Sequence, residues 1–215
     1  MVTRIGMAAR RSGLSIGAFQ AHWHDRHGPL VAKFRNVRRV WQNHALLRAG
    51  SPLLPWAGFD ACSEMEFDDL AAVKQALSEE HYPRELREDS AHLIDASKSA
   101  VMLVKRVHVS GSIDLCDIRL LTFLRRAPGR TQAELNEAPG MLPMASAARA
   151  REIYLPIDEP ERTPNGFDAI DVQWFGTPEG AERYVISPEA GEHRFAIAHL
   201  TRGVERVIAR VRVIL

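Results

Sequence analysis

The stretch "GFDACSEMEF" at residues 58–67 returns as "GFDAIDVQWF" at residues 166–175, 108 residues later. Self-similarity at a fixed spacing indicates that one structural unit occurs twice in the chain. Asp60 and Asp168 occupy the same place in the two copies. They are expected to be structural residues that start a strand in each half.

Around this repeat, both halves show the same order of apolar runs and turn signals. The first half predicts strands at 2–10, 37–47, 59–67 and 99–109 and helices at 15–34 and 68–90. The second half repeats this order from residue 115. Strand, helix, strand, strand, helix, strand is the order of a ferredoxin-like unit. The sequence therefore predicts an α+β fold with two tandem ferredoxin-like (βαββαβ) repeats, at residues 1–110 and 111–215, with antiparallel sheets.

The helix starts and the strand patterns support this arrangement. Ser15 and Thr131 each follow a Gly turn and are expected to be helix N-caps. A four-stranded sheet with helices on one face leaves an apolar second face that needs cover. In "VRRVWQNHALL" at 37–47, neither alternating set is purely polar, as expected for a strand with both faces partly covered. The two sheets are therefore expected to cover each other in a barrel-like sandwich.

The overall composition limits the classes of partner. The chain has 215 residues and a formal net charge of +1, and its basic residues are scattered among acids. Nucleic acid is therefore not an expected partner. The two cysteines, Cys62 and Cys116, fit no metal spacing and suit a reducing compartment. No membrane-spanning run or secretory leader is recognised, so a cytoplasmic protein is expected and a membrane partner is not.

The stretch "AHWHDRHGPLVAKF" at 21–34 holds three histidines within six positions. On a helix, Trp23 and His27 share one apolar stripe with Ile16, Phe19 and Leu30. Because Pro29 disfavours helical backbone in the residue before it, the first helix is expected to stop near His27, and a short second helix is expected to begin with Pro29. A histidine at a helix C-terminus would have a raised pKa and suit proton transfer.

Two other interpretations of this stretch stay open. His27 can simply cap the helix end by bonding a backbone carbonyl. A metal site is disfavoured, because His22 and His24 lie about 200° apart on a helix and cannot grip one ion. These two histidines are expected to be solvated or to lie in an interface.

His44 is the expected partner of His27. Strand alternation places His44 on one face with Val40 and Gln42. If that face lines the barrel lumen, it presents an imidazole and an amide to an apolar cavity, the usual form of a small-molecule site. A satisfied polar pair at the sheet edge is the alternative.

Several ordered motifs in the first half resemble the EthD family of the dimeric α+β barrel superfamily. The matching residues are Phe19, Trp23, His27, Gly28, Pro29 and Leu30, then Gln42, Asn43 and His44, then Phe59, Asp60 and Phe67. Glu66 departs from the aromatic residue usual at its position. The second half carries the repeat but lacks the helix-end motif, so activity that rests on His27 is expected once per chain.

The resemblance implies ferredoxin-like halves and small, mostly apolar ligands. Members of this family are associated with degradation of ethers and other xenobiotics, or with polyketide tailoring. Related barrels host cofactor-free monooxygenases, isomerases and cyclases. The fold alone constrains the reaction weakly.

The leading hypothesis is a cofactor-independent enzyme that acts on a small apolar compound, aromatic or polyketide-like. His27 and His44 are its expected catalytic residues, and proton transfer is its expected chemistry. The reaction would be an isomerisation, dehydration or cyclisation, or a monooxygenation in which the substrate carbanion reduces dioxygen. The expected substrate-binding residues are Gln42, Asp25, Trp23 and Trp41, and neither a metal nor another cofactor is expected.

Two further hypotheses compete with this one. The protein can be a non-catalytic binding or accessory protein for a hydrophobic metabolite, and haem binding is a third interpretation. A homodimer is also expected, because the loop "AGSPLLPWAG" at 49–58 carries an apolar run in a connector that would ordinarily be polar.

Overall fold

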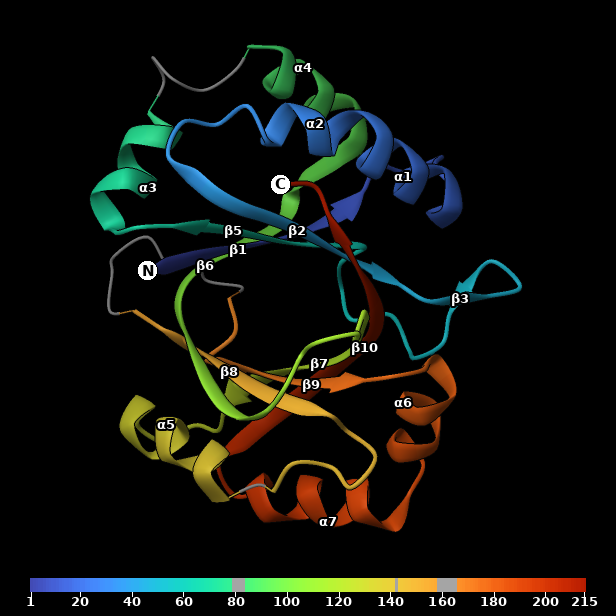
Figure 1. Cartoon of the computed structure of the whole chain (residues 1–215), viewed down its shortest axis with the longest axis vertical. Helices are drawn as coiled ribbons and strands as arrows, with labels where there is room; N and C mark the ends of the chain where they lie inside the picture. The colour runs from blue at the N-terminus through green and yellow to red at the C-terminus, as the bar shows by residue number, and fades with distance from the viewer. Residues whose placement is uncertain (79–83, 142, 158–165) are drawn as a thin grey trace.

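Within the described residues, eight strands close into one antiparallel barrel in the computed structural model of the chain (Figure 1). The structure describes residues 1–78, 84–141, 143–157 and 166–215. In order around the barrel, the strands are β1 (Val2–Arg10), β5 (Ala61–Phe67), β2 (Val37–Ala45), β10 (Thr201–Val213), β7 (Ile118–Arg126), β9 (Ala169–Phe175), β8 (Ala150–Pro156) and β6 (Ile94–Gly111). A separate short hairpin joins β3 (Leu47–Arg48) to β4 (Ser51–Pro52).

The order of the strands repeats the order of the sequence halves. The run β1-β5-β2 in the first half matches β7-β9-β8 in the second. The register matches too, because Phe67 lies opposite Val2 and Phe175 lies opposite Ile118. The predicted α+β fold with two ferredoxin-like repeats is therefore confirmed. The predicted division at residue 110 falls next to the last residue of β6, and it stays a prediction, because one closed sheet runs through both halves.

Two long strands join the halves. β6 pairs with β1 of its own half and then, from Val104 onward, with β8 of the other half. β10 pairs in the same way with β7 and, over its last residues, with β2. The barrel therefore closes within one chain.

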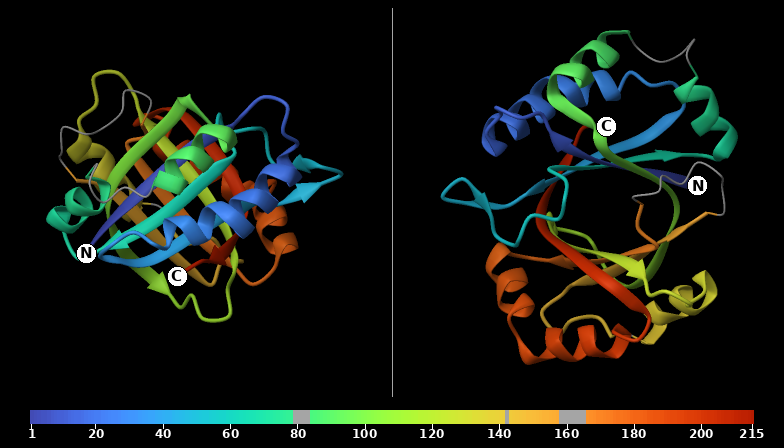
Figure 2. Two further views of the ribbon diagram at one scale, coloured as in Figure 1. Left: turned by 90° about the horizontal axis from the view of Figure 1, so that it is seen from above. Right: turned by 180° about the vertical axis from the view of Figure 1, so that it is seen from behind.

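Helices cover the barrel on two opposite sides (Figures 1 and 2). The first side holds α1 (Ile16–His22), the π-helical turn η1 (Trp23–His27), α2 (Gly28–Val31), α3 (Leu70–Leu77) and α4 (Arg84–Leu93). The second side holds α5 (Gln132–Met141), α6 (Pro178–Val185) and α7 (Pro188–Ile197). The helix predicted at 68–90 is represented by α3 and α4, and residues 79–83 lie outside the described residues.

The predicted caps and the repeated aspartates have matching roles in both halves. The Ser15 side chain accepts from the backbone N–H of Ala18, and Thr131 accepts from Glu134 N. Asp60 and Asp168 each accept a backbone N–H from the last residue of the neighbouring first strand, at 3.0 and 2.8 Å. The prediction that both aspartates are structural is supported by these identical contacts.

A charged network fills the middle of the lumen. Arg119, which is fully buried, donates to Asn43 Oδ1 at 3.0 Å and pairs with Glu64. Tyr154 donates its hydroxyl to Glu64 at 2.8 Å, and the Trp174 ring lies 3.8 Å from the guanidinium. Burial works to raise the pKa of Glu64, but Arg119 and its hydrogen-bond donors outweigh burial and hold that pKa below its usual value. The lumen is thus filled by paired charges.

The loop at 49–58 is partly covered by the chain itself. Leu53 and Leu54 pack against the apolar cluster of the second half, which includes Ile118, Tyr184 and Ile208. Trp56 remains 54% exposed. Two residues of the apolar run that suggested a dimer, Leu53 and Leu54, are therefore partly covered by the second half of the same chain.

Replacing Arg119 by Met should lower the free energy of unfolding by about 3–5 kcal/mol, because it leaves Glu64 buried without its counter-charge. Urea denaturation followed by circular dichroism measures this change. The matched control is Arg84→Met, which removes an exposed partner of Glu88 and should move the midpoint little. Equal effects of the two variants would contradict a structural role for the lumen network.

Candidate functional site

A cavity of about 150 Å³ lies between the helices of the first half and the outer face of its sheet. Its apolar lining includes Trp23, Val31, Phe34, Val40, Met65 and Leu86. Its polar lining consists of Arg4, His27, Gln42, Ser63, Ser90 and Ser99. An apolar hollow with a few convergent polar groups is the usual form of a site for a small molecule.

The wall that carries His27 is shaped by the π-helical turn. Gly28 donates its N–H to Trp23 O, five residues back, and Gln42 Nε2 donates to the same carbonyl at 2.8 Å. A Cβ on Gly28 would lie 3.0 Å from Gln42 Nε2, so glycine allows the helix to approach the strand closely. The predicted short second helix is present as α2, with Pro29 in its first turn. The predicted break at His27 is wrong, because Gly28 keeps helical angles and the wider turn accommodates the proline.

The π-helical turn also brings two histidines to one carboxylate. His27 Nδ1 lies 2.9 Å from Asp89 Oδ2, and His22 Nε2 lies 2.7 Å from Asp89 Oδ1. In a regular α-helix, residues five apart point about 140° away from each other and could not share a partner. Arg26 Nε lies 3.1 Å from the same Oδ1. Asp89, on α4, therefore joins the helix that carries the histidines to the helix that closes the cavity.

The carboxylate determines the tautomer of His27. An ionised carboxylate only accepts hydrogen bonds, so the proton of the neutral ring is on Nδ1 and the lone pair is on Nε2. Burial tends to raise the pKa of Asp89, but the hydrogen bonds from His22 and His27 outweigh burial and lower it, which keeps the carboxylate ionised. Among the described residues, none hydrogen-bonds His27 Nε2.

His27 is therefore neutral at neutral pH. It is 7% exposed, and burial lowers its pKa from 6.5 although Asp89 works to raise it. The expectation of a raised pKa from a helix C-terminus is wrong, because the helix does not end there and desolvation is the larger effect. A neutral imidazole with a free Nε2 at a cavity wall is equipped to accept a proton.

The alternation of β2 allowed His44 to face either the lumen or the helices. In the structure it lies on the helix side, not in the lumen. It stacks on Trp23 with ring centroids 4.7 Å apart, and its Nε2 lies 2.9 Å from Gln42 Oε1. Burial, with smaller contributions from His24 and Arg212, lowers the pKa of His44 to about 4. His44 does not line the cavity and reaches it only through Gln42, whose amide is bonded at both ends.

The other predicted site residues divide between different parts of the molecule. Trp23 lines the cavity beside His27. Asp25 is 76% exposed and bonds its neighbour His24 at 2.8 Å. Trp41 points into the lumen, where the Arg39 guanidinium lies 3.8 Å over its ring. The cavity therefore brings together His27, Gln42 and Trp23, and it does not include His44, Asp25 or Trp41.

Sequence reasoning missed Asp89, which holds His27 in place. A signal for it does exist in α4, where Leu86, Asp89 and Leu93 recur at helical spacing and are all buried. An acidic residue in an apolar helix stripe needs a buried partner. The sequence shows this pattern, but the partner, His27, lies 62 residues before Asp89 and could not be identified from the sequence alone.

In the corresponding layer of the second half, the described residues line a hollow of about 30 Å³. There, Arg151 Nε lies 2.6 Å from Asp171 Oδ1, and Gln173 accepts the backbone N–H of Ala145 at 2.9 Å. These polar groups bond one another. The difference supports the expectation of a single site per chain.

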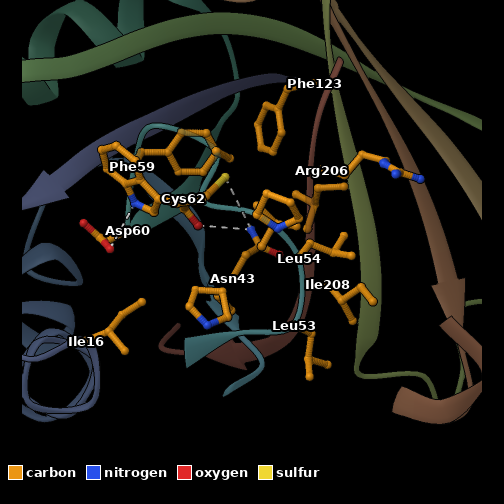
Figure 3. Close-up of a pocket in the computed structure, with 17 residues that line it drawn as sticks. Ile16, Asn43, Leu53, Leu54, Phe59, Asp60, Cys62, Phe123, Arg206 and Ile208 are labelled. Atoms are coloured by element: carbon orange, nitrogen blue, oxygen red, sulfur yellow. Dashed lines mark hydrogen bonds between the residues drawn. The ribbon is translucent and has the colours of Figure 1, made fainter. Parts of the chain in front are cut away.

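The two ends of the barrel offer less suitable hollows. Figure 3 shows the end beneath residues 52–57, a hollow of about 20 Å³ where Asn43 donates to Cys62 O at 3.1 Å. Burial raises the pKa of the Cys62 thiol, so this sulfur is a poor nucleophile. The opposite end is an open mouth of about 500 Å³ whose carboxylates, Glu66 and Glu152, are paired with arginines.

Two other features are absent from the described part of the chain. No group of three or more His, Cys, Asp or Glu side chains there is arranged to hold a metal ion. No helix there is long and apolar enough to cross a membrane.

Two ferredoxin-like units closed into one barrel, with a helix–sheet cavity in one of them, define a tandem α+β barrel protein. Residues 11–97 match the EthD domain model. The first half of this chain therefore contains an EthD domain. The resemblance of the sequence motifs to that family is confirmed.

Solved structures share the whole fold at low sequence identity. A protein described as anthrone oxidase-like covers 99% of this chain and 93% of its own, with a TM-score of 0.66 and 11% identity. A candidate monooxygenase from Lactobacillus acidophilus covers 99% and 94%, with a TM-score of 0.52 and 12% identity. A regulator of staphylococcal pathogenesis covers 99% and 100%, with a TM-score of 0.51 and 10% identity. No curated protein matches the chain.

The stability of the fold should fall between pH 6.5 and about 4 partly because of His44. Its pKa is about 4 when folded and 6.5 when unfolded, so the unfolded chain takes up the proton first as the pH falls. The shift corresponds to about 3 kcal/mol, present above pH 6.5 and lost toward pH 4. Urea midpoints across this range measure it, and His44→Gln, which keeps a donor near Gln42, should show a shallower fall. An unchanged slope would refute the assignment.

Proposed function

We propose that this protein removes a proton from a small, mostly apolar, weakly acidic molecule bound in the helix–sheet cavity of the first half, with His27 as the general base. The observation that carries the proposal is the buried His27–Asp89 pair, which holds a neutral imidazole with its free Nε2 at the cavity wall. This is the orienting arrangement that activates histidine bases in enzymes.

The surroundings of His27 support proton abstraction. Val31, Phe34 and Leu86 form apolar walls that limit solvation of the bound molecule. Once His27 is protonated, the Asp89 carboxylate at its Nδ1 stabilises the imidazolium. His44 and Gln42 then act as positioning residues, since Gln42 fixes the carbonyl of the π-helical turn and His44 fixes Gln42.

The structural neighbours suggest a type of substrate. One is described as anthrone oxidase-like and another as a candidate monooxygenase. Loss of a carbon-bound proton is a first step that isomerisation, dehydration, cyclisation and cofactor-free oxygenation have in common. Anthrone carries a weakly acidic methylene between two aromatic rings and is therefore a reasonable test compound.

The test is deuterium exchange at the anthrone methylene in heavy-water buffer without oxygen, followed by proton NMR. The protein should accelerate exchange over buffer, and His27→Gln should lower the rate by about 10²- to 10⁴-fold, the usual size of losing a general base. The rate should fall on acidification with a midpoint below pH 6.5, because burial lowers the pKa of His27 from that value.

Two matched variants complete this experiment. Asp89→Asn presents an amide N–H to Nδ1 and moves the ring proton to Nε2, so it should abolish most of the exchange. His92→Gln, which alters an exposed histidine that does not line the cavity, should leave the exchange rate close to that of the unmodified protein. Binding of anthrone without accelerated exchange would instead support the non-catalytic binding protein. Exchange that survives His27→Gln would refute the role of His27.

We also propose that the chain forms a homodimer in the cytoplasm. Trp56 remains 54% exposed next to the covered leucines of its loop, and the two cysteines form no disulfide, as suits a reducing compartment. Light scattering at micromolar concentration should give twice the mass of one chain, and Trp56→Ser should shift it toward the monomer. A monomeric unmodified protein would contradict the dimer.

A further inference from the structure

We propose that Arg4 and Ser63 form an oxyanion site on the floor of the cavity, so that the substrate class is a phenol or an enolisable aromatic ketone. This inference rests on the proposed function, because it identifies where the negative charge goes when His27 takes the proton. The electron pair of the broken C–H or O–H bond would reside on the oxygen that faces Arg4 and Ser63.

The floor of the cavity is a row of residues across three strands. Gly6 on β1 lies opposite Ser63 on β5, and Ser63 lies opposite Gln42 on β2. All three line the cavity together with Arg4 and with His27 in its wall. Because β-strand side chains alternate, Arg4 shares the outer face with Gly6 and Ser63, whereas Thr3 and Ile5 point to the lumen.

The absence of a side chain at Gly6 brings the two polar groups together. A Cβ built there would lie 2.9 Å from Ser63 Oγ and 3.2 Å from Arg4 Nη1. Both atoms therefore lie over the Cα of Gly6, within reach of one ligand oxygen. Any larger residue at this position would displace one of them, so the glycine is part of the site.

These two groups suit an oxygen that carries negative charge. The arginine guanidinium stays protonated and presents several donors in a planar fork. Ser63 Oγ lies 3.4 Å from Gly6 O, a long hydrogen bond that a ligand can replace by a shorter one. Charge-assisted hydrogen bonds of this kind are stronger than neutral ones, and more so in an apolar cavity.

The second half provides an internal comparison. Thr122 lies opposite Asp171 there, at the place where Gly6 lies opposite Ser63. Leu120 takes the place of Arg4. The carboxylate would repel an oxyanion and the leucine offers it no donor, and the second half also lacks a counterpart of His27. The base and the anion site therefore occur together in one half and are absent together from the other.

The test uses 4-nitrophenol, whose neutral and anionic forms have different absorption spectra. Titrated against pH in the presence of saturating protein, the bound probe should ionise at lower pH than the free probe, with at least a tenfold higher anionic fraction at a fixed pH. Arg4→Gln should abolish this shift and Arg4→Lys should keep part of it, with folding checked by circular dichroism. Arg38→Gln, which alters an exposed arginine, should keep the shift in full.

The role of His27 is separated in the same experiment. His27→Gln should leave the spectral shift in place, because the anion site does not need the base. A probe that ionises as in free solution, a shift that survives Arg4→Gln, or no binding of 4-nitrophenol at all would each overturn the oxyanion site. Deuterium exchange that depends on His27 would still support proton abstraction in any of those cases.

Discussion

Strands β6 and β10 each hydrogen-bond to both halves of the chain, and the rest of the structure depends on this double pairing. A ferredoxin-like sheet has an apolar face that its own helices cannot cover. By extending past their own half, β6 and β10 close the barrel formed by the described strands without an edge strand in it, and they bring the two inner faces against each other. Each half then has one face in the lumen and one face under helices, and only the second is available for a site that differs between halves.

Closure of the barrel determines what each face can do. The lumen contains residues from both halves, and its charges are held by partners across the barrel, as Arg119 of the second half is held by Glu64 of the first. Changing such a group disturbs both halves. The outer face of each sheet meets only its own helices. The two halves can therefore share one backbone architecture, with Asp60 and Asp168 in equivalent contacts, and still carry different side chains beneath their helices.

The fold could be predicted from the sequence because the same pattern of strands and helices occurs in both halves. The recurrence of 58–67 at 166–175 and the order of the apolar runs identified both ferredoxin-like units, and the strand at 2–10 agrees with β1. The site was harder to predict. Alternation showed that Gln42 and His44 share a face, but with both faces of β2 buried it could not distinguish the lumen from the helix side.

The π-helical turn was the other feature that the sequence did not reveal. Pro29 signals a disturbance of the helix, and the usual outcome is an end or a kink. Whether a helix can instead widen depends on its contacts with other elements, and here Gln42, from a strand that follows the helix, donates to Trp23 O beside the N–H of Gly28. The helix therefore continues, His27 turns toward Asp89 together with His22, and the expected charged helix end becomes a buried neutral imidazole. The choice between a capping histidine and a base thus depends on a contact between elements that no local pattern contains.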